Sequence, residues 1–294
     1  MSAEDIKAQI DKIRQFTKKC CVSTVMWNLP QNEIDDFKKW YKFLGFKSIY
    51  IIDNCSDKKI KDSTIRLEEK IGPSGAMRKI QSWVKINAPE EFVFHCDPDE
   101  FLFIDDPDIF DNYTGEFPMA FFWRNCISNK DENLIHKVNH VFAYSEFIKI
   151  NNVKTLGRVD QIENIGRSHY IFKNNLKIIN TDHQETRILK KEKEKITPKG
   201  KRVKFFVTCS VPFGKARWNR ACILHLKVKS KEDWLRKAAP DYAWRYYRAG
   251  NLKNTLYEPT MEDFKDFYET KKPHRMEPPY IQHLKWIELM GMGY

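Results

Sequence analysis

The stretch CVSTVMWNLPQNEIDDFKKWYKFLGFKSIYIID, residues 21–53, decides the fold. Residues 21–27 are apolar and rich in strand-forming side chains, as expected for a buried strand. Residues 31–44 place apolar side chains on one helical face, and Gly45 follows as a typical residue after a helix end. Residues 46–53 are a second short apolar strand. Strand, helix and strand at this spacing predict a βαβ unit, and therefore a parallel sheet.

Further elements of the same kind follow along the chain. Periodic apolar residues predict a leading amphipathic helix over 3–17 and another helix over 74–87. Apolar runs predict strands over 91–96, 117–124 and 221–226. The expected class is α/β, a Rossmann-like, mostly parallel sheet flanked by helices. The aromatic-rich tail after residue 240 has helical spacing and predicts a helical extension.

Composition indicates a folded chain with a basic surface. The 294 residues are 41% hydrophobic and 14% aromatic, enough for a sizeable core, and the formal net charge is +11. This charge favours an anionic partner, which can be nucleic acid, an anionic membrane or a phosphate-bearing small molecule.

Cysteine usage and the N-terminus bear on the compartment. The seven cysteines are odd in number and form no CxxC pair, so reduced thiols and a cytoplasmic location are expected. The first residues carry charges and no apolar signal core, and no run approaches the roughly 18 apolar residues of a membrane span. We therefore expect no transmembrane segment.

The sequence FVFHCDPDEF, residues 92–101, carries the strongest chemical signal. An apolar strand delivers three carboxylates to its carboxyl end, where parallel sheets bind ligands. Pro98 restricts the backbone of the turn, so Asp97 and Asp99 are held in place. Carboxylates so placed suit Mn²⁺ or Mg²⁺, which also bind phosphate oxygens. The alternative is an ordinary Asp-Pro turn after a strand.

Polar residues also flank the first βαβ unit. Glu33 lies at the start of its helix, and Asp53 and Asn54 end its second strand. Such groups at the sheet edge can hydrogen-bond a base or ribose, which makes them candidates for nucleotide-sugar binding. The alternative is purely local, with a helix start and a turn that use these side chains internally.

Two further segments are candidates for phosphate contacts. His225 ends the apolar strand ACILHL, and Lys227 precedes a predicted helix start at Ser230, where an anion is favoured. The alternative for His225 is a hydrogen-bonded core histidine. Lys154 and Arg158 can contact a diphosphate, although solvation of both side chains is the favoured interpretation.

The basic run LKKEKEKITPKGKRVK, residues 189–204, contains Pro and Gly. Such runs usually form a solvated, mobile loop, and this is the favoured prediction. The alternative is a flap that covers an anionic donor.

Three blocks resemble the family-2-like and family-92-like glycosyltransferases. They are NEIDDFKKWYKFLGFKSIYIIDNCSD (32–57), HCDPDEFLFI (95–104) and ILHLKVKSKEDWLRKA (223–238). The resemblance spans roughly residues 22–238 in separated blocks and implies a GT-A fold. We expect the catalytic domain to occupy residues 1–238 and the helical tail, residues 239–294, to pack on it as an extension.

The same resemblance implies an activity and assigns residues to it. The chain would be a hexosyltransferase-like enzyme (EC 2.4) that moves a sugar from a UDP- or GDP-sugar to a glycan or other hydroxyl acceptor, with inversion and with a divalent metal. By motif, Glu33 and Asp53 would face the nucleoside, Asp97 and Asp99 the metal, and His225 the metal or diphosphate.

A catalytic base has no distinctive motif in this sequence. Asp182 and Glu185, in INTDHQET, follow the metal motif outside a clear helix and are the predicted bases. Asp160 and Glu163 are alternatives.

Two other function classes remain open. One is a metal-dependent protein that binds nucleic acid or cleaves phosphodiesters, although dispersed lysines and the lack of a known module argue against a nucleic-acid partner. The other is a non-catalytic sugar-binding protein of the same fold.

Overall fold

The computed structural model describes residues 2–127, 142–143, 153–165, 170–172, 178–183, 185–186, 188–196, 202–210, 220–228 and 274–275. Its helices are α1 (Ala3–Thr17), α2 (Gln31–Phe43) and α3 (Pro73–Asn87), with short 3-10 helices η1 (Pro107–Phe110) and η4 (Val159–Gln161). Its strands are β1 (Cys20–Met26), β2 (Ser48–Asp53), β3 (Ile65–Arg66), β4 (Phe92–His95), β5 (Glu100–Ile104), β6 (Met119–Ile127), β7 (Phe142–Ala143), β8 (Val153–Arg158), β9 (Ile162–Ile165), β10 (Tyr170–Phe172), β11 (Ile178–Ile179), β12 (Glu185–Thr186), β13 (Ile188–Ile196), β14 (Arg202–Ser210), β15 (Ala221–Val228) and β16 (His274–Arg275).

The predicted βαβ unit is confirmed. Strands β1 and β2 are parallel, with Val22 opposite Ile49 and Val25 opposite Ile52, and α2 connects them. The connection turns at Gly45, whose φ of +87° favours glycine. A β-carbon there would also lie 2.7 Å from Cγ of Arg14, so the turn allows α1 to approach closely.

The sheet is parallel on one side and mixed on the other. Its strands follow the order β12-β11-β6-β8-β4-β1-β2-β3, and β4, β1, β2 and β3 are mutually parallel. Strand β8 is antiparallel to both β4 and β6. Strand β15 lies between β5, to which it is antiparallel, and β6, to which it is parallel. The predicted α/β class, a mostly parallel sheet flanked by helices, is therefore confirmed.

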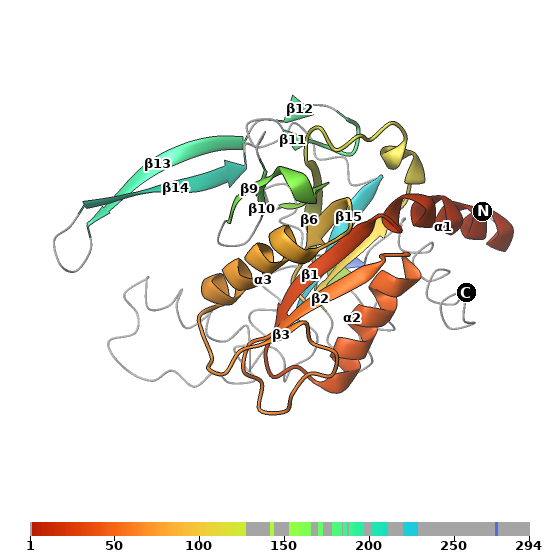
Figure 1. Cartoon of the computed structure of the whole chain (residues 1–294). Coiled ribbons are helices and arrows are strands. Elements are labelled where there is room, and N and C mark those ends of the chain that lie inside the picture. Colours follow the sequence, from red (N-terminus) through yellow and green to blue (C-terminus); the bar gives the residue numbers. More distant parts are fainter. Residues whose placement is uncertain are drawn as a thin grey trace.

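Two hydrophobic clusters cover the two faces of the central strands. Successive strand residues point to opposite faces, so Val22 and Phe94 join one cluster while Cys21 and Val93 join the other. The first cluster contains the apolar faces of α1 and α2, and the second contains that of α3. Figure 1 shows α2 and α3 on opposite sides of the sheet. These layers fix the strand ends that carry the polar residues below.

The basic run 189–204 does not form the predicted loop. It contributes to β13 and β14, which pair antiparallel with each other from Ile188 opposite Ser210 to Ile196 opposite Arg202. Charges alternate with the strand period in KKEKEK, and the segment VKFFV supplies a strongly strand-forming partner. The hairpin extends away from the sheet (Figure 1). Its connection, residues 197–201, lies outside the described residues.

The predicted helical extension, residues 239–294, is described only at His274–Arg275. There the chain forms β16, which pairs antiparallel with β7. The rest of this prediction lies outside the described residues, and the domain boundary at residue 238 stays a prediction. Within the part of the chain that the structure describes, no helix has the length and apolar character needed to cross a membrane.

Candidate functional site

The acidic turn at residues 97–100 connects β4 to β5 at the carboxyl end of β4. The backbone N–H of Glu100 donates to the carbonyl oxygen of Asp97 at 3.0 Å. The Glu100 carboxylate accepts from the backbone N–H of Asp97 at 2.7 Å, which closes the turn a second time. Asp99 and Glu100 are buried, at 3% and 0% exposure, whereas the side chain of Asp97 is 41% exposed. The turn thus places one accessible and two enclosed carboxylates at one strand end.

Lys154 on β8 enters this turn from the neighbouring strand. Leu156 pairs with Phe94, so Lys154 lies two residues further along, beyond the end of β4. Its Nζ is 3.0 Å from Oδ2 of Asp97 and 3.0 Å from Oε2 of Glu100. The side chain is only 1% exposed, so the favoured interpretation of a solvated lysine is wrong.

The clustered charges of the turn shift one another's pKa values. Desolvation opposes the charged form of Asp97, but the Lys154 ammonium outweighs it and lowers the pKa of this carboxyl. Desolvation dominates at Glu100 and raises the pKa of its carboxyl well above the ordinary value. Desolvation also opposes the charge on Lys154, yet Asp97 and Glu100 raise the pKa of the ammonium above the ordinary value. Lys154 therefore stays charged and acts as the internal counter-ion of the turn.

His225 reaches the same turn from β15. Because β15 is antiparallel to β5, His225 lies directly opposite Glu100. Its Nε2 is 3.8 Å from Oδ2 of Asp99, and its side chain is 11% exposed. The structure thus brings together the predicted residues Asp97, Asp99, Lys154 and His225 from separate parts of the chain.

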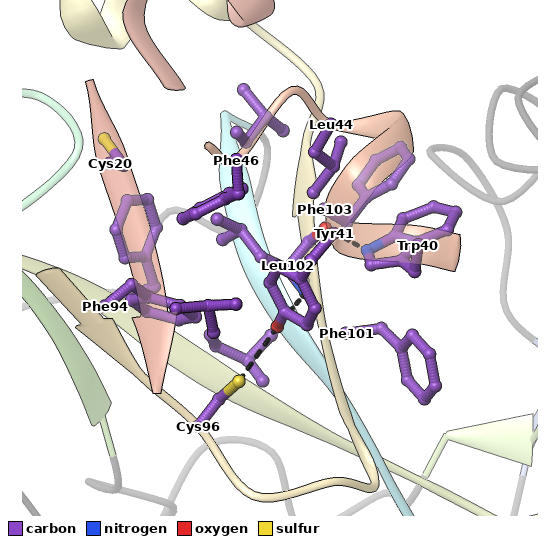
Figure 2. Packing of buried hydrophobic residues seen from close by; sticks show 14 of the residues in the cluster. Cys20, Trp40, Tyr41, Leu44, Phe46, Phe94, Cys96, Phe101, Leu102 and Phe103 are labelled. Carbon is purple, nitrogen blue, oxygen red and sulfur yellow. Dashed lines mark hydrogen bonds between the residues drawn. The ribbon is translucent and has the colours of Figure 1, made fainter. Parts of the chain in front are cut away.

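Two aromatic residues of α2, Trp40 and Tyr41, hold the backbone around the turn and in β5 (Figure 2). The Tyr41 hydroxyl donates to the carbonyl oxygen of Glu100 at 3.0 Å, and it accepts from the Cys96 thiol at 3.2 Å. Trp40 Nε1 donates to the carbonyl oxygen of Leu102 at 3.0 Å. Both rings are buried in the core, so these hydrogen bonds attach β5, which begins at Glu100, to the core.

His95 is a residue of this end of the sheet to which the sequence assigned no role. It is 2% exposed, and its Nδ1 is hydrogen-bonded to the Ser23 hydroxyl at 2.9 Å. Ser23 and His95 are register partners on β1 and β4. The signal was a histidine at the last position of an apolar strand, directly before the carboxylates.

Asp53 and Asn54 shape the loop after β2. The Asp53 carboxylate is 0% exposed and accepts from the backbone N–H of Ser56 at 2.8 Å and of Ile60 at 3.1 Å. Arg66 Nη1 also donates to it, at 2.5 Å. Asn54 pairs through both side-chain atoms with the backbone of Ile71. These contacts match the alternative that the side chains organise a turn, while nucleoside binding by this loop stays a prediction.

Glu33 occupies the first turn of α2, which follows the carboxyl end of β1. The residue is 9% exposed. It shares the sheet edge with Asp53, since Met26 at the end of β1 is the register partner of Asp53. Its predicted contact with a nucleoside stays a prediction.

The predicted bases Asp182 and Glu185 lie at the opposite end of the sheet. Arg220, directly before β15, has Nη1 3.5 Å from Oδ1 of Asp182. His225 is five positions further along that strand, which corresponds to roughly 16 Å. Glu185 belongs to β12, whose partner β11 pairs with β6 at its first residue, Met119. Sequence order alone did not reveal which strand end these residues occupy, and the structure does not bring them to the acidic turn.

The alternative bases and Arg158 also lie at that opposite end. Arg158 is the register partner of Phe92, the first residue of β4. Its guanidinium is 3.0 Å from Glu91 and 2.9 Å from Asp160, so it is an exposed ion pair away from the turn. Glu163 follows in β9. The backbone of Lys227 belongs to β15, two residues after His225. The helix predicted from Ser230 lies outside the described residues.

The turn provides some of the ligands that a metal ion would need, but not a complete set. Among the residues that the structure describes, no group of three or more His, Cys, Asp and Glu side chains is placed to hold a metal ion. The predicted ligands do not form a ready-made three-ligand site, because Asp97 already contacts Lys154 while Asp99 faces His225. A cation here would need ligands from a bound molecule or water as well.

Known proteins show little similarity to this chain. No family model matches the sequence, and no curated protein matches it. Among solved structures, residues 1–349 of TarS from S. aureus are similar with a TM-score of 0.30 and 13% identity, over 49% of this chain and 48% of that one. The match therefore spans about half the length of each protein.

Proposed function

We propose that the chain is a metal-dependent glycosyltransferase that transfers a sugar from a UDP- or GDP-sugar to a hydroxyl acceptor, on a fold of GT-A type. One observation carries the proposal. Two of the sequence blocks that resemble glycosyltransferases, HCDPDEFLFI and ILHL, pair as β5 and β15, so that His225 lies opposite Glu100 and 3.8 Å from Asp99. Separate motifs of one chemistry thus meet at one strand end.

The residues of this end fit a divalent cation in part. Two ligands that each lie about 2.1 Å from one ion are at most about 4.2 Å apart, and Asp99 and His225 meet this condition. We propose that Asp99 and His225 hold the cation, with the exposed Asp97 carboxylate beside it. When bound, Mn²⁺ or Mg²⁺ would neutralise the negative charge on the diphosphate leaving group. The imidazole must be neutral to serve as a ligand.

The reaction is a substitution at the anomeric carbon of the sugar. The acceptor oxygen forms a bond to this carbon, the bond to the diphosphate oxygen breaks, and the acceptor proton passes to a base. Inversion follows if the acceptor attacks from the face opposite the diphosphate. Asp182 is not proposed as this base, because it contacts Arg220, which lies five residues before His225 on the same chain segment, or about 16 Å along the strand.

A thermal-shift screen of UDP- and GDP-sugars with and without Mn²⁺ tests the donor. A donor at a hundredfold its dissociation constant should stabilise the protein by about 2.7 kcal/mol, and only when Mn²⁺ is present. Release of nucleoside diphosphate without acceptor then tests chemistry. If no nucleotide sugar raises the melting temperature and none is hydrolysed, the glycosyltransferase proposal fails.

The substitution Asp99→Asn tests the cation site. It keeps the size of the side chain but removes the charge, so Mn²⁺-dependent donor binding and transfer should fall at least about a hundredfold, while the fold survives. Asp108→Asn is the matched control, because Asp108 is exposed and pairs with Lys12 instead. Near-normal turnover of Asp99→Asn would show that the metal assignment is wrong.

A further inference from the structure

Lys154 is the one buried lysine among the residues whose burial the structure describes. Its ammonium contacts Asp97 and Glu100 at 3.0 Å each and is 1% exposed. A side chain so enclosed does not reach a bound ligand directly. Any effect on the site must pass through the carboxylates that it holds.

The Asp97 carboxylate contacts the buried Lys154 and is also accessible from outside the turn. Its Oδ2 is 3.0 Å from the Lys154 ammonium, yet the side chain is 41% exposed. By contrast, Glu100 is 0% exposed, and its Oε2 is used by both Lys154 and the backbone N–H of Asp97. The ammonium is therefore shared between one fully buried carboxylate, Glu100, and one partly exposed carboxylate, Asp97.

A divalent cation bound at this turn would compete with Lys154 for the Asp97 carboxylate. Hard cations in proteins bind carboxylate oxygens, and like charges repel strongly where water is excluded. With Lys154 in place, Asp97 is already neutralised in part, which leaves the pair Asp99 and His225 to attract the ion.

We propose that Lys154 is a positioning residue that serves as a built-in cation, holding Asp97 and competing with an external divalent cation for its charge. The inference rests on the proposed function for its role. By weakening the turn's affinity for the bare ion, Lys154 makes phosphate oxygens of the donor necessary for tight cation binding. The ion then enters with the nucleotide sugar, which favours the donor complex over idle metal binding.

The test is Mn²⁺ binding to the full chain, measured by isothermal titration calorimetry without nucleotide. Lys154→Met should bind bare Mn²⁺ roughly ten- to a hundredfold more tightly than the wild type, since a repelling charge is removed and Asp97 is released. Lys154→Arg is the matched control and should stay within about threefold of the wild type, because it keeps the positive charge.

A second variant covers the case in which Lys154→Met does not fold. Lys154→Met with Glu100→Gln removes a buried charge together with one of its partners, which proteins tolerate far better than losing one partner alone. Release of Asp97 should again tighten bare Mn²⁺ binding, by at least about threefold. If both variants bind Mn²⁺ within twofold of the wild type, Lys154 has only a structural role in the buried ion pair and the inference is overturned.

Failure of the two proposals can be told apart. If Lys154→Met gains Mn²⁺ affinity while no UDP- or GDP-sugar binds the wild type, the built-in cation stands and the glycosyltransferase assignment falls. If nucleotide sugars bind with Mn²⁺ but the Lys154 variants leave the affinity for bare Mn²⁺ unchanged, the glycosyltransferase assignment stands and the proposed role of Lys154 falls.

Discussion

A single hydroxyl group, that of Tyr41, supports the backbone of the acidic turn. Tyr41 is fully buried and donates to the carbonyl oxygen of Glu100 at 3.0 Å. Tyr41→Phe should reduce the free energy of unfolding by about 1–3 kcal/mol, because buried groups lose their partner. It should also weaken Mn²⁺-dependent donor binding, because the turn loses its attachment to α2. Urea unfolding and donor titration measure the two effects.

Tyr113→Phe is the matched control for this prediction. The Tyr113 hydroxyl donates to the carbonyl oxygens of Leu156 at 3.0 Å and Phe117 at 3.1 Å, away from the turn. It should cost similar stability and leave donor affinity unchanged. Equal losses of donor affinity in both variants would mean that general loosening of the core, not the turn, explains the effect.

Asp53 gives a prediction about pH. Desolvation opposes its charge, but hydrogen bonds from Ser56, Ile60 and Arg66 outweigh it and lower the pKa of this carboxyl below its ordinary 3.8. A lowered folded-state pKa means that the carboxylate stabilises the fold at pH above the unfolded value, and that this contribution is lost as pH falls through the folded value. Compared with Asp53→Asn, the wild type should therefore lose more unfolding free energy between pH 6 and about pH 3. Urea titrations at several pH values test this, and parallel pH profiles would contradict it.

Residue identity alone predicted only part of the site. The carboxylates of Asp97 and Asp99 were evident, because they follow an apolar strand. The burial of Lys154 was not, because lysines are mostly exposed and its partner Asp97 lies 57 positions away. A buried lysine becomes predictable only once the pairing of its strand is known.

At the scale of elements, local patterns predicted the first half of the sheet. Strands β1 and β2 and helices α1 to α3 have clear periods of two or 3.6 residues, and each lies within about two residues of its expected range. Strand β8 was not predicted. Its sequence VKTLGR is short, contains Gly and Lys, and becomes a strand by pairing with β4 and β6 on both sides.

The hairpin of β13 and β14 is expected to be dispensable for folding. These strands pair only with each other in the described sheets, and Leu189 lies opposite Cys209. Replacing residues 190–208 by a short Gly-Ser turn should leave a cooperative thermal transition within about 5 °C of the wild type, because closing a shorter loop costs little entropy. Loss of the cooperative transition would show that the hairpin stabilises the body of the fold. Donor and acceptor assays of the same variant would test the alternative of a flap.

At the scale of the whole molecule, the net charge of +11 favours an anionic partner. The proposed function assigns it a phosphate-bearing small molecule, so binding of duplex DNA should be weak. A salt titration of DNA binding by fluorescence anisotropy is the measurement. Tight binding with a log–log salt slope of several units would favour the nucleic-acid alternative, because such slopes count phosphates neutralised by the protein.

The central position of β15 has a consequence for biosynthesis. Strand β5 ends at residue 104, but its partner β15 begins only at residue 221. While the ribosome adds the intervening segment, β5 presents an open, apolar edge that can capture another chain. We expect the unfinished chain to be most prone to aggregate in this interval. Residues 221–228 both pair with that edge and deliver His225, so one strand covers β5 and completes the acidic turn in the same step.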